Sequence, residues 1–569
     1  MRLLVFLLLL AAVPASAQLT GRAHEPVVIE AALAPDLLGR APAEIAAFRW
    51  TGTDWAAVPV QVDERATIDL GDAFGALDPF DCESVLFCIA LTGQVVETFY
   101  TDAGTFVGPD PDPALDGDDE IVLLAADAGR RAPASVPDPP GSIPGTRTEV
   151  EITADGESAF LYLAAHDGSL DPSAGQDLIR YTFDLLSGDY LTTYDVAGGD
   201  SDGGSPVGDA LGANPEATTV ETGAYALHFS DRWILDGLAL ADGEGTYGPD
   251  LLDRRKVLFA PGDCDRHETT GSRGEGAFVV NRDGPVRALR SVVGFNSGPL
   301  VQRTDVFYPA LVVSTTALRV HAIPGVMDLM DYTDAARGMT YRANTASVGV
   351  AVDGVPDADV SDGTPLEWET LTGPMGSLLT RHEIETTADG FEPVLYYADD
   401  DQNPPRQCTG DGAALGQSGL WIPQSVPSTD PRLGSSTVMR STRTVLLSPT
   451  PLTEAEQDAT LAVMASPMTI TVAPIGTSAE ADRVVQTRLT VAPNPTAGAA
   501  TVSFSVTTPT DVRVSVVDAL GREVWRAGDR RLGAGPHRVA LDLSRLAPGW
   551  YAVRVATETS VSTHPLMRR

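Results

Sequence analysis

The residues best suited to acid–base chemistry are His321, Asp328 and Asp331, which lie in one polar stretch of the chain. An imidazole titrates near neutral pH and a carboxylate can fix its tautomer, so this set could move protons at a glycan bond. The alternative is that His321 is packed and hydrogen-bonded on a strand, as isolated histidines usually are. The spacing leaves both interpretations open.

The same stretch is rich in arginine, amide and tyrosine side chains. Guanidinium groups hold carboxylates in a bidentate manner and aromatic faces pack on rings, so such a set is typical of carbohydrate binding. The predicted binding residues are Arg287, Arg290, Asn296, Arg303, Tyr308 and Arg319. The alternative is that they form internal pairs or face outward from strands. Strand alternation is also taken to place Arg287 and Arg290 on the face opposite to Ala288.

Acidic residues crowd the loop from 110 to 120, with Asp119 among them, just before an apolar run. Such a loop could bind Ca²⁺, which takes about six to eight oxygen ligands. The predicted ligands are Asp110, Asp112, Asp116, Asp118 and Glu120. The spacing departs from the EF-hand loop because Pro113 follows Asp112, so a solvated acidic turn is the alternative.

Two standard catalytic motifs are not found in this sequence. It contains no H-E-x-x-H zinc helix and no P-loop, so zinc-protease and P-loop NTPase chemistry have no recognisable motif here. The formal net charge is −39, from 78 acidic and 39 basic residues. Because phosphate backbones are bound through clusters of Lys and Arg, this balance argues against nucleic acid as a partner.

The first 17 residues predict a cleavable secretory signal. Arg2 supplies the basic start, Leu3 to Val13 the apolar core, and Ala15-Ser16-Ala17 the small-residue cleavage site. The mature chain is expected to begin at Gln18 and to carry no membrane span, since no other run approaches the length of about 20 apolar residues.

Four cysteines in an exported chain favour disulfides over metal ligation. Cys82 and Cys88 are close enough to close a small loop, which leaves Cys264 and Cys408 as the long-range pair. Four cysteines allow three connectivities, so the other two pairings stay open.

The C-terminal segment alternates clearly between apolar and polar residues. Half-buried strands are predicted over 502–506, 512–516, 539–543 and 551–555, separated by Gly- and Pro-containing turns. About 80 residues therefore predict a small antiparallel, immunoglobulin-like sandwich.

Within that segment, four motifs resemble the type A sorting domain of the type IX secretion system. They are Pro493-Asn494-Pro495, the turn Asp518-Ala519-Leu520-Gly521-Arg522-Glu523, the segment Leu543-Ser544-x-Leu546-x-Pro548-Gly549-x-Tyr551, and the terminal Arg568-Arg569. The resemblance implies that the type IX machinery recognises this domain and that the cargo crosses the outer membrane. It also implies that the domain is removed as the cargo is released or linked to the cell surface.

Between these two ends, strand patterns dominate and predict a mainly β fold. The expected divisions are a signal at 1–17, an N-terminal β unit at 18–132, a Pro-rich connector at 133–145, a large β-sandwich at 146–473, a linker at 474–488 and the sorting domain at 489–569. A capping box at Thr453 and Glu456 predicts one helix over 454–465. The strands around Tyr308 and Arg319 resemble, at fold level, the mutarotase-like sandwiches of carbohydrate-active enzymes. A resemblance of fold alone does not indicate a reaction.

The sequence therefore predicts an exported cell-surface or released protein whose central β unit binds polysaccharide. Whether it also processes the polysaccharide is left open; an enzyme of this kind would be a lyase, a hydrolase or an epimerase. The competing interpretation is a non-catalytic surface or adhesion protein, or a structural one, stiffened by Ca²⁺.

Overall fold

The structure is a computed structural model of the 569-residue chain. It describes residues 19–75, 95–186, 191, 215–242, 246–259, 264, 266–269, 276–294, 300–320, 325–357, 360, 364–386, 393–425, 437–474, 484–486, 490–492, 496, 498–506, 510–518, 523–528, 530–533, 535–546, 549–556 and 561–568. The predicted signal, Cys82 and Cys88 lie outside these residues. Strands dominate, which confirms the mainly β class.

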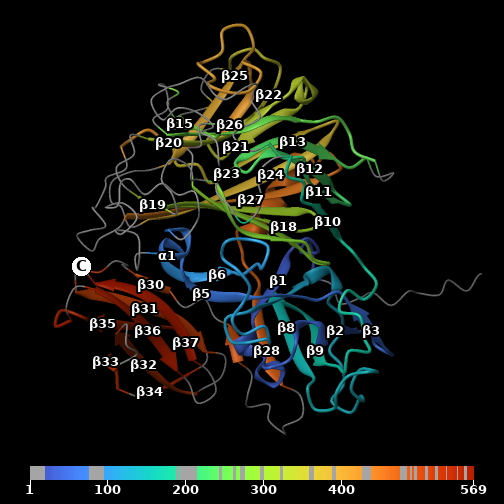
Figure 1. Ribbon diagram of the computed structural model, residues 1–569, viewed down its shortest axis with the longest axis vertical. Helices are drawn as coiled ribbons and strands as arrows, with labels where there is room; N and C mark the ends of the chain where they lie inside the picture. Colours follow the sequence, from blue (N-terminus) through green and yellow to red (C-terminus); the bar gives the residue numbers. More distant parts are fainter. Residues whose placement is uncertain are drawn as a thin grey trace, which may run out of the picture.

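The N-terminal unit, in blue and cyan in Figure 1, is built on a sheet of order β29-β28-β8-β9-β2-β3. A second sheet, β1-β7-β4, and the pair β5-β6 complete it. The elements are β1 (Pro26–Glu30), η1 (Ala31–Leu33), η2 (Pro35–Leu37), η3 (Pro42–Glu44), β2 (Ile45–Trp50), β3 (Trp55–Val58), β4 (Gln61–Asp63), β5 (Arg65–Asp69), α1 (Leu70–Gly75), β6 (Val96–Tyr100), β7 (Glu120–Leu124), η5 (Ala125–Asp127), β8 (Thr148–Ala154), β9 (Glu157–Ala165), β28 (Thr469–Pro474) and β29 (Val484–Gln486).

This first sheet joins segments that are far apart in the chain. The strand β8 pairs with β9 on one side and with β28 on the other, and β9 also pairs with β2. Strands from both sides of the predicted connector at 133–145, together with a strand from the end of the cargo region, thus share one core. Alternating burial in β8 and β28 places Val150, Ile152 and Val472 in that core.

The larger unit contains a nine-stranded sheet of order β16-β17-β18-β19-β27-β24-β23-β21-β22 and a five-stranded sheet of order β15-β14-β20-β26-β25. A four-stranded sheet, β10-β11-β12-β13, adjoins them. The elements are β10 (Ile179–Thr182), β11 (Thr218–Thr222), β12 (Tyr225–Asp231), β13 (Ile234–Leu240), β14 (Leu252–Phe259), β15 (Arg266–His267), β16 (Ala277–Arg282), β17 (Ala288–Val293), β18 (Val301–Phe307), β19 (Leu311–Val320), β20 (Val326–Tyr332), η7 (Asp334–Ala336), β21 (Thr340–Ala343), β22 (Ala346–Ala351), β23 (Trp368–Gly373), β24 (Gly376–Thr386), β25 (Val394–Asp400), β26 (Ala414–Ile422), β27 (Thr437–Ser448) and α3 (Glu454–Met464).

The N-terminal unit packs against the outer face of the nine-stranded sheet. One apolar cluster joins Leu70 and Phe74 to Val279 and Val293, and a second joins β7 to residues of β19, β24 and β27. Such clusters bury side chains from both units, so the two units share a continuous apolar boundary.

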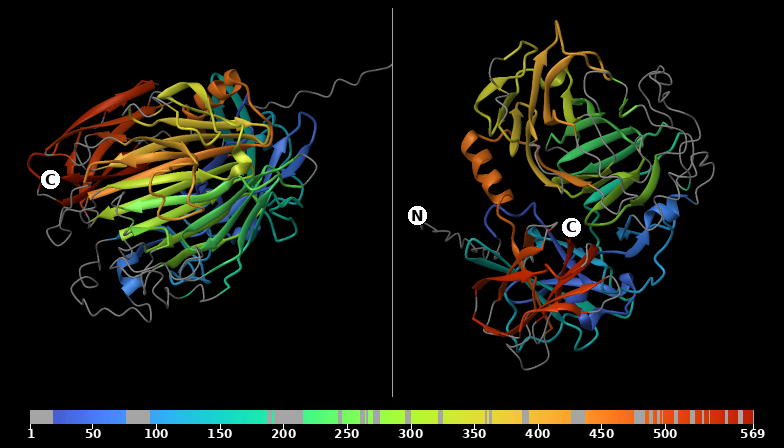
Figure 2. Two further views of the ribbon diagram at one scale, coloured as in Figure 1. Left: turned by 90° about the horizontal axis from the view of Figure 1, so that it is seen from above. Right: turned by 90° about the vertical axis from the view of Figure 1, so that its left-hand side faces the viewer.

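The predicted helix is confirmed as α3, which begins one residue after Thr453. The Thr453 hydroxyl accepts from the backbone N–H of Glu456, and the Glu456 carboxylate accepts from the backbone N–H of Thr453. Figure 2 shows this helix, in orange, on the flank between the larger and the N-terminal units. Gln457 faces the larger unit, where it accepts from Arg342 and Thr370.

The C-terminal unit consists of two small antiparallel sheets. Their elements are β30 (Thr490–Ala492), β31 (Ala499–Val506), β32 (Thr510–Asp518), β33 (Glu523–Arg526), β34 (Arg530–Leu532), β35 (Gly535–Asp542), β36 (Gly549–Ala556) and β37 (Val561–Arg568). The alternating residues Val502, Val514, Leu541 and Val553 form its core, as the sequence predicts. Within the described part of the chain, helices are too short or too polar to cross a membrane.

Candidate functional site

A layer of charged side chains lies between the nine-stranded and five-stranded sheets. At its centre, Arg255 donates two hydrogen bonds to the Asp328 carboxylate, at 2.9 and 2.7 Å. Arg443 reaches across from the nine-stranded sheet to donate to the Asp328 backbone carbonyl at 2.8 Å. Arg303, on β18, lies 4.0 Å from the same carboxylate. Ion pairs therefore join the two sheets through their interior.

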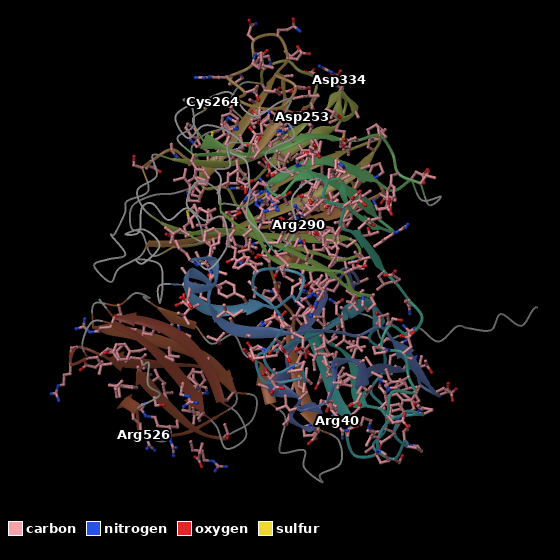
Figure 3. All side chains as sticks on the ribbon, viewed as in Figure 1. Arg40, Asp253, Cys264, Arg290, Asp334 and Arg526 are labelled. Atoms are coloured by element: carbon pink, nitrogen blue, oxygen red, sulfur yellow. A yellow bond between two sulfur atoms is a disulfide. The ribbon has the colours of Figure 1, made fainter. Side chains whose placement is uncertain are left out.

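This polar layer extends across the sandwich, and its side chains are all buried. Arg290 pairs with Glu216, and Figure 3 shows Arg290 deep within the larger unit. His382 lies 2.8 Å from Glu369, which also accepts from Tyr341 at 3.0 Å. The name polar layer is used below for this set of buried residues: Arg255, Arg290, Arg303, Arg443, Asp305, Asp328, Glu216, Glu369 and His382. Apolar clusters border it at both ends.

The charges of the layer set the pKa values of its members. Burial alone would raise the pKa of Asp328, but attraction to Arg255 and Arg443 outweighs it and holds that pKa far below its usual range. Burial and the neighbouring Arg255 lower the pKa of Arg303 to about 10. Burial is likewise overcome at Glu369, where the hydrogen bond from His382 lowers the pKa to about 2. The carboxylates are therefore held ionised by partners inside the protein.

The structure does not bring the predicted catalytic residues together. His321 lies outside the described residues. Asp328 faces the interior, whereas Asp331 lies on the opposite face of β20, where it pairs with Lys256 and accepts from Gln417 at 3.2 Å. Burial outweighs the attraction of Lys256 and raises the pKa of Asp331 to about 6. Two carboxylates on opposite faces of one strand cannot act on one bond.

The predicted sugar-binding residues that the structure describes are also buried in internal pairs. Arg290 and Arg303 belong to the polar layer, and Arg319 donates to Glu97 of β6 at 3.2 and 2.9 Å. Tyr308 is buried and accepts from Arg287 at 3.1 Å. Asn296 lies outside the described residues.

Arg287 joins the two units through a set of contacts that we call the clamp. It donates to Asp63 at 2.7 Å and to Glu120 at 2.6 Å, both from the N-terminal unit. The prediction that Arg287 and Arg290 share a face is wrong: Arg290 points into the sandwich, whereas Arg287 points outward to the clamp. Three positions separate them, and an odd separation on a strand places side chains on opposite faces.

Of the predicted calcium ligands, Glu120 belongs to the clamp and Asp112 and Asp116 cap backbone N–H groups of their own loop. Burial and the nearby Asp116 raise the pKa of Asp118 to about 6. Only Asp110 joins a compact carboxylate group. The residues predicted from spacing therefore do not converge as a set.

The compact group consists of Glu64, Asp110 and Asp119, which we call the carboxylate trio. One oxygen from each lies within 4.8 Å of the other two. Burial and the neighbouring Asp119 and Asp110 raise the pKa of Glu64 to about 7. Glu64 was missed because its own surroundings in the sequence are not acidic enough to mark it; only the pairing of β4 with β7 brings it to the loop.

A pair of aromatic side chains lies on the outer face of the five-stranded sheet. The rings of Trp421 and Tyr396 are 6.1 Å apart and perpendicular, and both side chains are half-buried. They pack on Leu258, Met327 and Leu329. Among described residues, the indole N–H of Trp421 has no hydrogen-bond partner. Sequence alternation could have indicated this outward-facing pair.

The predicted long-range disulfide is confirmed beside this face. Cys264 and Cys408 are joined, with Cα atoms 5.3 Å apart. Cys408 also packs against the cluster that contains the aromatic pair. The disulfide therefore ties the 401–413 segment to the edge of the sheet near β15.

One cavity of about 280 Å³ lies where α3 and β1 meet the nine-stranded sheet. Val28, Leu311 and Met464 contribute to its mainly apolar lining. His24 and Glu25 are its only titratable lining residues in the described structure. None of the predicted site residues lies there.

The sorting motifs are described in part. Gly549 begins β36, and Tyr551 is half-buried against the C-terminal core. Arg568 donates to the backbone carbonyl of Leu543 at 2.9 Å. Pro493, Asn494, Pro495, Gly521 and Pro548 lie outside the described residues.

Comparisons with known proteins identify the C-terminal unit. Residues 490–567 match the family model of the secretion system C-terminal sorting domain. This region is the type IX sorting domain that the motifs predict, and it marks the chain as a cargo exported to the cell surface or the extracellular space. The domain implies an interaction with the type IX secretion machinery.

The remaining comparisons are weaker. A search of the curated proteins gave no match. The chain is similar to a protein described as an aldose 1-epimerase from Escherichia coli K12, at 14% identity and a TM-score of 0.18, over 40% of this chain and 97% of that one. It is also similar to a pullulanase from Bacillus acidopullulyticus, at 13% identity and a TM-score of 0.11; that match covers 45% of this chain and 33% of the pullulanase.

Proposed function

We propose that this cargo is a carbohydrate-binding protein of the cell surface or its surroundings, and that it binds a neutral polysaccharide without cleaving it. The observation that carries the proposal is the perpendicular, half-buried pair of Trp421 and Tyr396 on the outer face of the five-stranded sheet. Aromatic rings with one apolar face and one polar tip suit the apolar faces and hydroxyl groups of sugars.

The surroundings of the aromatic pair support a binding surface. Lys256, Asp331 and Gln417 lie on the same face of the sheet but are buried, and hydrogen bonds join them to one another and to Gln407, so they stiffen the sheet beside the aromatic pair. The pKa of Tyr396 is raised by burial and by the nearby Asp331. A half-buried aromatic pair held on a rigid sheet loses little conformational freedom when a ligand binds, which favours a binding surface there.

Charge supports a neutral ligand rather than a polyanion. The chain carries a formal net charge of −39, so an anionic polysaccharide would approach against a repulsive field. The arginines that would bind uronate groups are held by Asp63, Glu216, Glu97 and Asp328 inside the protein. Neutral glucans, mannans and xylans are therefore the ligands to screen first.

The placement of the described titratable groups supports the proposal of binding without cleavage. Among described residues, the candidate acids Asp328 and Asp331 are buried, ion-paired and on opposite faces of β20. Catalysis on a glycan requires two such groups to converge on one accessible bond. The described carboxylates of this strand do not offer that arrangement.

The test is a binding screen on immobilised neutral polysaccharides with the full mature chain, reading released sugars in parallel. Trp421→Ala and Tyr396→Ala are each expected to weaken binding roughly tenfold or more. The matched control is Tyr247→Ala, an exposed tyrosine between β13 and β14, which should bind like the wild type. Equal affinity in Trp421→Ala, or release of sugar products, would overturn the proposal.

A further inference from the structure

Three carboxylates converge at one corner of the N-terminal unit. Glu64 lies at the corner between β4 and β5, and Asp110 and Asp119 belong to the long connection between β6 and β7. Their ligand oxygens all lie within 4.8 Å of one another. This carboxylate trio draws on segments more than 40 positions apart, so the fold itself, and not a local turn, assembles it.

The second observation is the state of the Glu64 side chain. Glu64 is 8% exposed, and within the described structure neither of its carboxylate oxygens has a hydrogen-bond partner. The Oδ2 atom of Asp110, buried beside it, also has none. A buried carboxylate without donors is costly, because the group loses water and gains nothing in exchange. The Oδ1 atom of Asp110 accepts from the backbone N–H of Asp112 at 2.7 Å, so the atoms without partners are both Glu64 oxygens and Asp110 Oδ2. Their position side by side indicates that a ligand of positive charge supplies the missing contacts.

The basic side chains nearby are already engaged. Arg65 pairs with Glu120, and Arg287 pairs with Asp63 and Glu120. Arg282 lies 3.6 Å from Asp63; its charge also acts to lower the pKa values of Glu64 and Asp110, but burial outweighs it and both pKa values are raised. In the described part of the chain, no arginine, lysine or histidine forms an ion pair with a member of the trio. Asp119 is held in place instead by backbone N–H groups of Arg65 and Asp116, at 2.8 and 2.9 Å.

We infer that Glu64, Asp110 and Asp119 bind a calcium ion. All three ligands are oxygens, which calcium prefers. The three oxygens lie within 4.8 Å of one another, so small side-chain rotations bring all of them to one ion. Calcium accepts irregular oxygen geometry, whereas Mg²⁺ requires a near-ideal octahedron, so calcium is the better fit. The site is independent of the aromatic pair and of the proposed glycan.

The ion would fix the loop that holds the two units together. Within the connection between β6 and β7, Asp102 accepts from the backbone N–H of Asn281 at 2.8 Å, and Thr105 donates to the carbonyl of Val279 at 2.7 Å. Both partners belong to β16 of the larger unit. Calcium at Asp110 and Asp119 would therefore stiffen a segment that already docks on that strand.

The test is isothermal titration of calcium chloride into the chelator-stripped mature chain, paired with thermal unfolding at each calcium concentration. The wild type should bind one calcium ion at this site, and its midpoint should rise with calcium more than with equal magnesium. Glu64→Gln and Asp110→Asn should weaken calcium binding at least tenfold and lose most of that rise.

The matched control is Asp112→Asn, an exposed carboxylate of the same loop, which should keep the calcium response. Glu64→Gln removes a buried charge without a partner, so its calcium-free midpoint should equal or exceed that of the wild type, which distinguishes a lost site from a misfolded chain. A wild-type chain that does not respond to calcium, or a response that Glu64→Gln and Asp110→Asn both retain, would overturn the inference.

Discussion

Two adjacent residues, Asp63 and Glu64, belong to two regions that differ in whether a buried carboxylate has hydrogen-bond partners. Asp63 is fully buried in the clamp, where Arg287 donates to it at 2.7 Å and Gln61 donates at 2.9 Å. Glu64 is buried in the carboxylate trio, with neither oxygen bonded within the described structure. Both side chains have lost water, but only the first has gained partners in return.

Buried charges of these two kinds have different roles: one kind holds the fold together and the other binds a ligand. A buried charge with all its partners in the protein locks two elements together, and removing one partner is costly. A buried charge without a partner adds nothing to stability by itself, so its presence indicates a ligand. The clamp and the Arg255–Asp328 pair of the polar layer belong to the first kind, and Glu64 of the trio belongs to the second.

The largest effect is expected from breaking the clamp. Arg287→Met leaves Asp63 and Glu120 buried without their guanidinium, and should lower the free energy of unfolding by about 3 to 5 kcal/mol. Chemical denaturation followed by tryptophan fluorescence measures this loss. A change below about 1 kcal/mol would mean that the clamp is not closed in solution.

Acid should weaken the polar layer next. Because Glu369 has its pKa lowered to about 2, its contribution is present above the unfolded pKa near 4.5 and is lost as the pH falls toward 2. The loss amounts to about 3 kcal/mol for this shift. Glu369→Gln should flatten the fall in stability over this window, measured by denaturation at stepped pH. Glu383→Gln, which changes an exposed carboxylate on the neighbouring strand β24, should leave the slope unchanged.

Substitutions at the neighbouring residues Asp63 and Glu64 should change the stability in opposite directions in the absence of calcium. Asp63→Asn weakens the clamp and lowers stability, whereas Glu64→Gln removes an unpartnered charge and should raise it by about 1 kcal/mol. Both are measured by thermal unfolding in chelator. Destabilisation by Glu64→Gln equal to that by Asp63→Asn would show that the two residues have the same role and would break the comparison.

The smallest effect is expected at an exposed ion pair. Arg180 and Glu221 are 3.6 Å apart on the four-stranded sheet, with side chains 74% and 39% exposed. Arg180→Ala should change the free energy of unfolding by less than about 1 kcal/mol. The same denaturation assay provides this reference value for the clamp. A larger loss would mean that burial does not explain the difference.

Local patterns in the sequence predicted local structure well. The capping box predicted α3, and the C-terminal motifs predicted the sorting domain. The Cys264–Cys408 bridge was also predicted. Each of these depends on residues near one another, or on a count that leaves few choices.

The partners of the charged residues could not be predicted, because they depend on which sheets pack together. Asp63 and Arg287 are 224 positions apart, and no local signal marks one as the partner of the other. The sequence showed acidic residues near 110–120 but could not place Glu64 among them. It also treated the arginines of 287–319 as a binding surface, whereas the sheets bury them in pairs.

The most direct test of this contrast is anomalous diffraction from crystals of the mature chain grown in calcium chloride. The account predicts a calcium peak between Glu64, Asp110 and Asp119, and none beside the ion-paired Asp63 or Asp328. A trio bridged only by water or by a basic side chain of the protein would contradict it, because the unpartnered carboxylates would then need no cation.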